Sequence, residues 1–128
     1  YSTKGAPCVC MKAWHKADHS KPAPGDGPKR GTPHNLKTTQ MRNFLKQSPN
    51  PTLGAAVDET KEAYRAHDPR ISELKPPAKQ QEALDCLEII LMVYLQSVAE
   101  KVDDGPGTKK RAPTFKEMRA EKLRVTSY

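Results

Sequence analysis

The sequence predicts an all-α fold with one long central helix, about residues 78–103, two or three short helices, and long, extended, proline-rich basic arms. Three observations support this prediction. Apolar residues in the central segment recur at three- and four-residue steps, which is the period of a helix. The chain contains 12 prolines, and no stretch alternates apolar and polar residues as a half-buried strand does. A hydrophobic fraction of 35% indicates a small helical nucleus rather than a large core.

The central helix has the strongest apolar pattern in the chain. The uninterrupted apolar run 89–95 makes its middle apolar on every side, and the remaining segments have too few apolar residues to cover it. We therefore expect the surface of a partner to cover the part of this helix that the chain leaves exposed. Pro76-Pro77 opens this helix and Gly105-Pro106 closes it. The residues expected at a partner-helix interface form one stripe: Leu84, Leu87, Leu91, Leu95 and Val98.

The shorter elements follow from local signals. Residues 35–47 predict a short amphipathic helix. Thr52 can cap a second helix that runs to about Arg65, and Asp68 with Pro69 can start a short helical turn. Thr114 and Glu117 have the spacing of a capping box, which predicts a basic helix from Phe115 to about Val125.

Charge and composition divide the chain into three parts: an extended basic arm (1–34), a small helical nucleus (35–104), and a basic linker with a C-terminal helix (105–128). The net charge is +5 over residues 1–40, −4 over residues 78–104 and +5 over residues 105–128. Basic arms around an acidic helix favour contact with a polyanion, either RNA phosphates or an acidic protein surface. The candidate residues for RNA or partner binding are Lys12, Trp14, Lys16, Lys29, Arg30, Lys109, Lys110, Arg111, Arg119 and Lys122.

Cys8 and Cys10, followed by His15 and His19, are the one metal-like group in the sequence. The spacing of the histidines matches that of zinc ligands, but a single residue between the cysteines does not. The alternative is that the two thiols are incidental and that Trp14 packs against a partner. We therefore predict no metal and no cofactor, and keep these four residues as candidates.

Sequence motifs for catalysis are absent: there is no glycine-rich phosphate loop, nucleophile elbow or HExxH. Glu82, Asp85 and Glu88 form an acidic ridge, which we interpret as solvated or facing lysine and arginine side chains. We expect neither an enzyme nor a small-molecule substrate.

Cellular location is indicated by three further features. Three cysteines do not make a disulfide framework, and Cys86 is expected on the apolar side of the central helix as a reduced thiol. The longest uncharged stretch of the central helix, 89–99, is too short for a membrane span. The chain begins with Tyr1 and its first residues are basic, as in a protein processed after mitochondrial import; any basic tail of a cytoplasmic or cytoskeletal protein has the same composition.

These observations predict a non-catalytic structural subunit of a large assembly. Within that class we favour a mitochondrial ribosome, because basic arms around a small helical nucleus suit packing against rRNA and neighbouring proteins. The first alternative is an accessory subunit of a mitochondrial respiratory or ATP synthase complex. The second is a microtubule-associated protein that lines axonemes, with its basic arms on acidic tubulin.

Overall fold

The computed structural model describes residues 8–11 and 28–124 of the chain. These residues form helices and no strand, which confirms the predicted all-α fold with one long helix. The helices are α1 (Pro33–Gln47), α2 (Leu53–His67), α3 (Pro69–Ser72), α4 (Pro77–Val98) and α5 (Phe115–Ala120).

The helix starts lie where side chains can cap the backbone. Thr52 Oγ1 accepts a hydrogen bond from the Ala55 backbone N at 3.1 Å, and Asp68 accepts one from the Arg70 backbone N at 3.0 Å. Both predicted caps are therefore confirmed. α1 begins two residues earlier than predicted, because buried Thr32 provides its cap.

The capping box of α5 is also present as predicted. Thr114 Oγ1 accepts from the Glu117 backbone N at 3.1 Å, and Glu117 Oε1 accepts from the Thr114 backbone N at 3.0 Å. Each residue thus satisfies a backbone donor that the helix end leaves without a partner.

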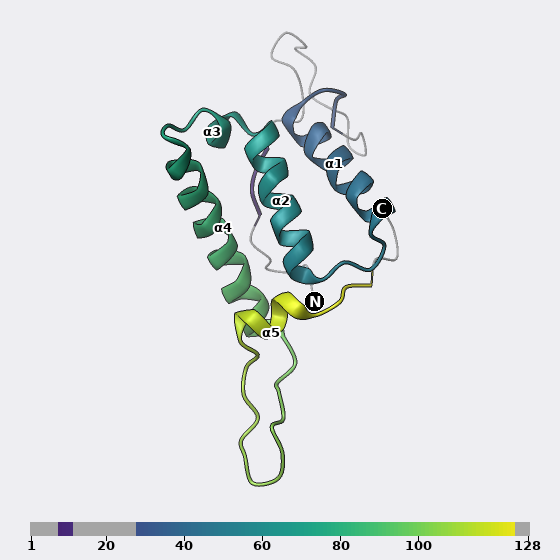
Figure 1. Cartoon of the computed structure of the whole chain (residues 1–128), viewed down its shortest axis with the longest axis vertical. Helices are drawn as coiled ribbons and strands as arrows, with labels where there is room; N and C mark the ends of the chain where they lie inside the picture. Colours follow the sequence, from purple (N-terminus) through teal and green to yellow (C-terminus); the bar gives the residue numbers. More distant parts are fainter. Residues whose placement is uncertain (1–7, 12–27, 125–128) are drawn as a thin grey trace.

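α2 lies at the centre of the fold. It contacts each of the other four helices, with α1 on one side and α4 on the other. α3 joins α2 to α4 at one end, and α5 crosses the opposite end (Figure 1). Among the described helices, α4 thus lies at an edge, and α2 is the one long helix that contacts it.

The core forms where α2, α4 and α5 meet. Its buried residues are Leu53 and Val57 of α2, Met92 and Leu95 of α4, and Met118 of α5. Burying a side chain of this size stabilises the fold by about 1.5–3 kcal/mol. The C-terminal helix is therefore part of the same core as α2 and α4.

α4 and α5 are both shorter at their C-termini than the sequence predicts. α4 ends at Val98 and α5 at Ala120, rather than near residues 103 and 125. After α5 the chain is extended: Leu123 donates to the Pro51 carbonyl and the Glu121 carbonyl accepts from Leu53, both at 2.8 Å. This pairing replaces the predicted last turn.

The early end of α4 has an electrostatic reason and a structural one. Glu100, Asp103 and Asp104 would lie in the last turn of a longer helix, where the helix dipole disfavours negative charge. Val102 instead exchanges backbone hydrogen bonds of 2.6 and 3.0 Å with Arg111. This bridge closes a loop between α4 and α5.

Candidate interaction surfaces

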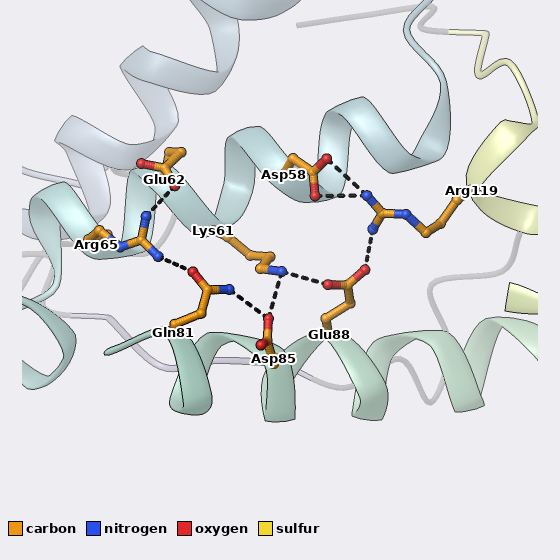
Figure 2. Close-up of polar contacts among 8 residues, drawn as sticks. All are labelled: Asp58, Lys61, Glu62, Arg65, Gln81, Asp85, Glu88 and Arg119. Atoms are coloured by element: carbon orange, nitrogen blue, oxygen red, sulfur yellow. Dashed lines mark hydrogen bonds and ion pairs between the residues drawn. The ribbon is translucent and has the colours of Figure 1, made fainter. Parts of the chain in front are cut away.

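A polar network connects α2, α4 and α5 and determines which charged residues are engaged within the protein (Figure 2). The Lys61 amino group lies 3.0 Å from Asp85 Oδ1 and 2.7 Å from Glu88 Oε2. Arg119 of α5 pairs with Asp58 of α2 at 2.8 Å and with Glu88 of α4. Lys61 and Arg119 therefore contact different oxygens of the Glu88 carboxylate. Through these two contacts α4 is held against α2 and α5.

The same network continues toward α3. Arg65 pairs with Glu62 on its own helix and donates to Gln81 Oε1 at 2.6 Å, and Gln81 donates to Asp85 at 2.7 Å (Figure 2). A row of polar contacts thus runs along the α2–α4 contact, beside the apolar core.

The charges of the network stabilise one another. Burial acts to lower the pKa of Lys61, but its hydrogen bonds with Glu88 and Asp85 outweigh that effect and raise the pKa. The hydrogen bond with Lys61 lowers the pKa of Asp85, as does the bond from Gln81. The pKa of Arg119 is raised, first by its hydrogen bond to Asp58. The three groups are all held in their charged forms.

The acidic ridge of α4 therefore faces cations, as the sequence interpretation proposed. Asp85 and Glu88 contact Lys61, while Glu82 is exposed and pairs with Lys79 at 3.2 Å. The arrangement also changes the interpretation of Arg119, which was a candidate polyanion contact. Its guanidinium is engaged by two carboxylates of the same chain.

Residues 102–111 form a projecting loop between α4 and α5 (Figure 1). At its tip the Thr108 backbone N donates to the Gly105 carbonyl at 3.3 Å. Pro106 and Gly107 occupy the middle of this turn, and the φ of +80° at Gly107 is one that a type II turn requires and glycine adopts without strain.

Arg111 fixes the base of this loop. Its guanidinium lies 2.7 Å from both Asp104 and Glu117, which belong to the loop and to α5. The hydrogen bonds from Arg111 and from Thr114 lower the pKa of Glu117 to about 2. Arg111, predicted to bind a polyanion, thus has two internal partners, whereas Lys109 and Lys110 beside it are exposed.

The other predicted cations differ in their surroundings. Lys122 is exposed and lies in the extended segment after α5, where it is bridged to Thr52. Lys29 is half-buried and its carbonyl accepts from the Thr32 hydroxyl at 2.7 Å, while Arg30 is exposed. Lys12, Trp14 and Lys16 lie outside the described residues.

The outer face of α4 is an exposed apolar surface that the sequence analysis did not separate from the inner one. Ile89 and Ile90 are each 55% exposed and Val93 is 53% exposed. Cys86, which the sequence placed on the apolar side of the helix, lies one turn before Ile90 and is a free, exposed thiol. Positions 86, 89, 90 and 93 share one side of a helix, and we call them the α4 outer stripe.

The predicted partner-helix stripe lies on the opposite side of α4. Leu84 and Leu95 are buried inside the protein, while Leu87 and Leu91 are half-buried. Val98, at the end of the helix, is 43% exposed. Buried Met92 is a core residue that the predicted stripe missed. It lies three residues before Leu95, a spacing that puts neighbouring side chains on one helix surface. Most of the predicted interface is therefore used within the chain.

Cys8 and Cys10, two of the metal candidates, are described: Cys8 lies beside residues of α2 and α4, and Cys10 lies beside the start of α3. Cys8 and Val9 line an apolar cavity of about 210 Å³ together with Val57, Tyr64 and Leu84. Arg70 donates to the Cys10 carbonyl at 2.6 Å and pairs with buried Asp68. Both thiols are exposed.

His15 and His19, the other two metal candidates, lie outside the described residues. Within residues 8–11 and 28–124, no three His, Cys, Asp or Glu side chains are grouped as metal ligands would be. In the same part of the chain no helix has both the length and the apolarity that crossing a membrane requires.

Comparison of the chain with protein-family models, with curated proteins and with solved structures finds no match.

Proposed function

We propose that this protein is a non-catalytic structural subunit of a large assembly, most consistent with a mitochondrial ribosome, where it contacts rRNA backbone and neighbouring proteins. One observation carries this proposal. Arg111 and Arg119 pair with carboxylates of the same chain, whereas several lysines near them in the sequence are exposed and have no carboxylate partner among the described residues. In the part of the chain that the structure describes, no carboxylate lies within ion-pair distance of these lysines: Lys109, Lys110, Lys116 and Lys122.

Lysines in this state suit phosphate contacts. A lysine that contacts a phosphate releases a condensed counterion from the nucleic acid, and this release favours binding without reading sequence. Lys109 and Lys110 suit such contacts because they are exposed and belong to the loop that the Val102–Arg111 bridge closes. Arg111 supports the loop instead of binding RNA, since Asp104 and Glu117 engage it.

The proposal predicts that the protein co-sediments with ribosomal RNA in fractionated mitochondria. Tagged native protein is released from the purified particles with increasing salt, before and after ribonuclease treatment. The variant Lys109→Ala/Lys110→Ala is expected to leave the particle at lower salt. The logarithmic dependence of its affinity on salt should also fall by roughly 0.7–0.9 for each phosphate that the variant no longer neutralises.

Lys46→Ala/Lys75→Ala is the matched control, because it removes the same charge from two exposed lysines far along the chain from the loop. It is expected to leave the salt dependence close to that of the native protein. Retention after complete RNA digestion would overturn the ribosomal proposal. Migration with a respiratory or ATP synthase complex, or with axonemes, would instead support the corresponding alternative.

A further inference from the structure

Residues 8–11, which we call the arm segment, lie against the helices of the fold. Cys8 and Val9 line the apolar cavity beside α2 and α4, and the Cys10 carbonyl accepts a hydrogen bond of 2.6 Å from Arg70 in α3. The segment contains no helical turn and is drawn out along α2 (Figure 1). It therefore has two attachments, the cavity at its start and Arg70 near its end.

Two exposed thiols belong to this segment, and one residue separates them. They are Cys8 and Cys10, with Val9 between them. Alternate residues of an extended chain point to the same side, and each residue advances the chain by about 3.3 Å, so their Cβ atoms lie roughly 6–7 Å apart. A disulfide requires Cβ atoms about 3.8 Å apart. The two cysteines can therefore be joined only if the chain turns at Val9 and the arm segment shortens.

We propose that Cys8 and Cys10 are a redox-modification site, at which a peroxide forms a disulfide that releases the arm segment and thiol reductants restore it. One thiol sulfur attacks a peroxide oxygen, the O–O bond breaks, and a sulfenic acid and water form. The other thiol attacks the sulfenic sulfur, the S–O bond breaks, and a second water leaves. The two sulfurs together lose the two electrons that the peroxide accepts.

Reduction reverses the change by thiol–disulfide exchange. Two glutathione thiols restore the pair Cys8 and Cys10 and leave as glutathione disulfide. The arm segment can then extend again and return to the cavity and to Arg70. This inference goes beyond the proposed function and rests on a different part of the chain.

The contacts of the arm segment oppose the disulfide, because they belong to the extended form. A turn at Val9 draws Cys8 and Cys10 together, so the segment cannot keep both the cavity contact and the bond from Arg70. By linkage, a change that loosens the segment favours the disulfide, and the disulfide loosens the segment to the same extent. Release uncovers the apolar cavity of about 210 Å³.

The first experiment identifies the bond and the release in the full chain. A Cys86→Ser background prevents cross-linking through the α4 outer stripe. After hydrogen peroxide treatment, peptide mapping is expected to find a disulfide between Cys8 and Cys10. NMR is expected to show contacts between the methyls of Val9 and Ile90 in the reduced protein and their loss after oxidation. Cys10→Ser is the matched control, which cannot form the bond and should keep these contacts under the same treatment.

The second experiment measures the equilibrium of the dithiol with glutathione. Arg70→Ala removes one attachment and is expected to shift this equilibrium toward the disulfide by roughly two- to tenfold, the effect of one hydrogen bond. Arg65→Ala removes the same charge from a residue that bonds to Gln81 instead, and should leave the equilibrium unchanged. Circular dichroism checks that both variants remain helical.

Three results would overturn the proposal. The first is that oxidation forms no bond between Cys8 and Cys10. The second is a disulfide that leaves the contacts between Val9 and Ile90 in place. The third is an Arg70→Ala variant whose equilibrium with glutathione equals that of the native protein.

Discussion

α4 has two long faces, and the other described residues cover only one of them. Leu84, Met92 and Leu95 are buried on the inner face, and Glu88 beside them joins both Lys61 and Arg119. Ile89, Ile90 and Val93 are apolar to the same degree and remain more than half exposed. The difference is not one of hydrophobicity. Within residues 8–11 and 28–124, α2 is the one long helix that contacts α4, and it covers a single side.

The sharpest test of this comparison replaces one residue on each face by aspartate. Leu95→Asp is expected to destabilise the fold by about 3–5 kcal/mol or to unfold it, because a carboxylate would be buried without a partner. Val93→Asp, two residues away, is expected to change the free energy of unfolding by about 0.5 kcal/mol or less. Urea denaturation of both variants measures the difference. Equal destabilisation would show that the two faces are covered alike.

The next effect concerns the close contact between α2 and α5. A Cβ at Gly54 would lie 3.0 Å from the Arg119 carbonyl oxygen and 3.2 Å from its Cβ. Gly54→Ala is therefore expected to destabilise the fold by about 1–3 kcal/mol, since α5 must move. Ala55→Gly, at the neighbouring exposed position, is the control for helix propensity and should cost about 1 kcal/mol. Thermal unfolding compares them; a stabilised Gly54→Ala variant would contradict the observed packing.

A smaller effect is expected from the polar side of the inner face. Glu88→Gln keeps the shape of the side chain but removes the charge shared by Lys61 and Arg119, whose other partners are Asp85 and Asp58. We expect a loss of about 1–2 kcal/mol in the free energy of unfolding. Glu82→Gln, on an exposed ion pair, should lose less than about 0.5 kcal/mol. If the two variants are equally stable, the network does not hold α4 in place.

The smallest expected effect is the acid dependence at the base of the loop. The folded pKa of Glu117 is lowered from 4.5 to about 2, so its contribution to stability is present above pH 4.5 and is lost as pH falls toward 2. The stability difference between the native protein and Glu117→Gln should therefore shrink over that range. Glutamine can still complete the capping box, which isolates the contact with Arg111. A difference that is constant from pH 6 to pH 2 would be inconsistent with this ion pair.

The helix starts were predictable because their causes are local. Thr52, Asp68 and Thr114 each bond to a backbone group two or three residues away, and such contacts need no other part of the fold. The helix ends were less predictable. α4 stops at Val98 and α5 at Ala120 where the chain pairs with Arg111 and with residues 51–53.

The candidate site was predictable in composition more than in arrangement. The sequence identified basic residues in the C-terminal third and an apolar long helix, and both are present. It did not distinguish Arg111 and Arg119, which pair within the chain, from Lys109 and Lys110, which do not. It also assigned the partner interface to the face of Leu84 and Leu95, which the fold buries.

The sequence by itself determined that the chain forms helices, where α2, α3 and α5 begin, and that the middle of the long helix is apolar. These properties depend on residue type and on contacts within one turn. The tertiary structure decided which face of α4 is buried and which cations stay exposed. Arg119 meets Glu88 and Asp58 across separations of 31 and 61 residues. Contacts at such separations exist only once α2, α4 and α5 are packed together.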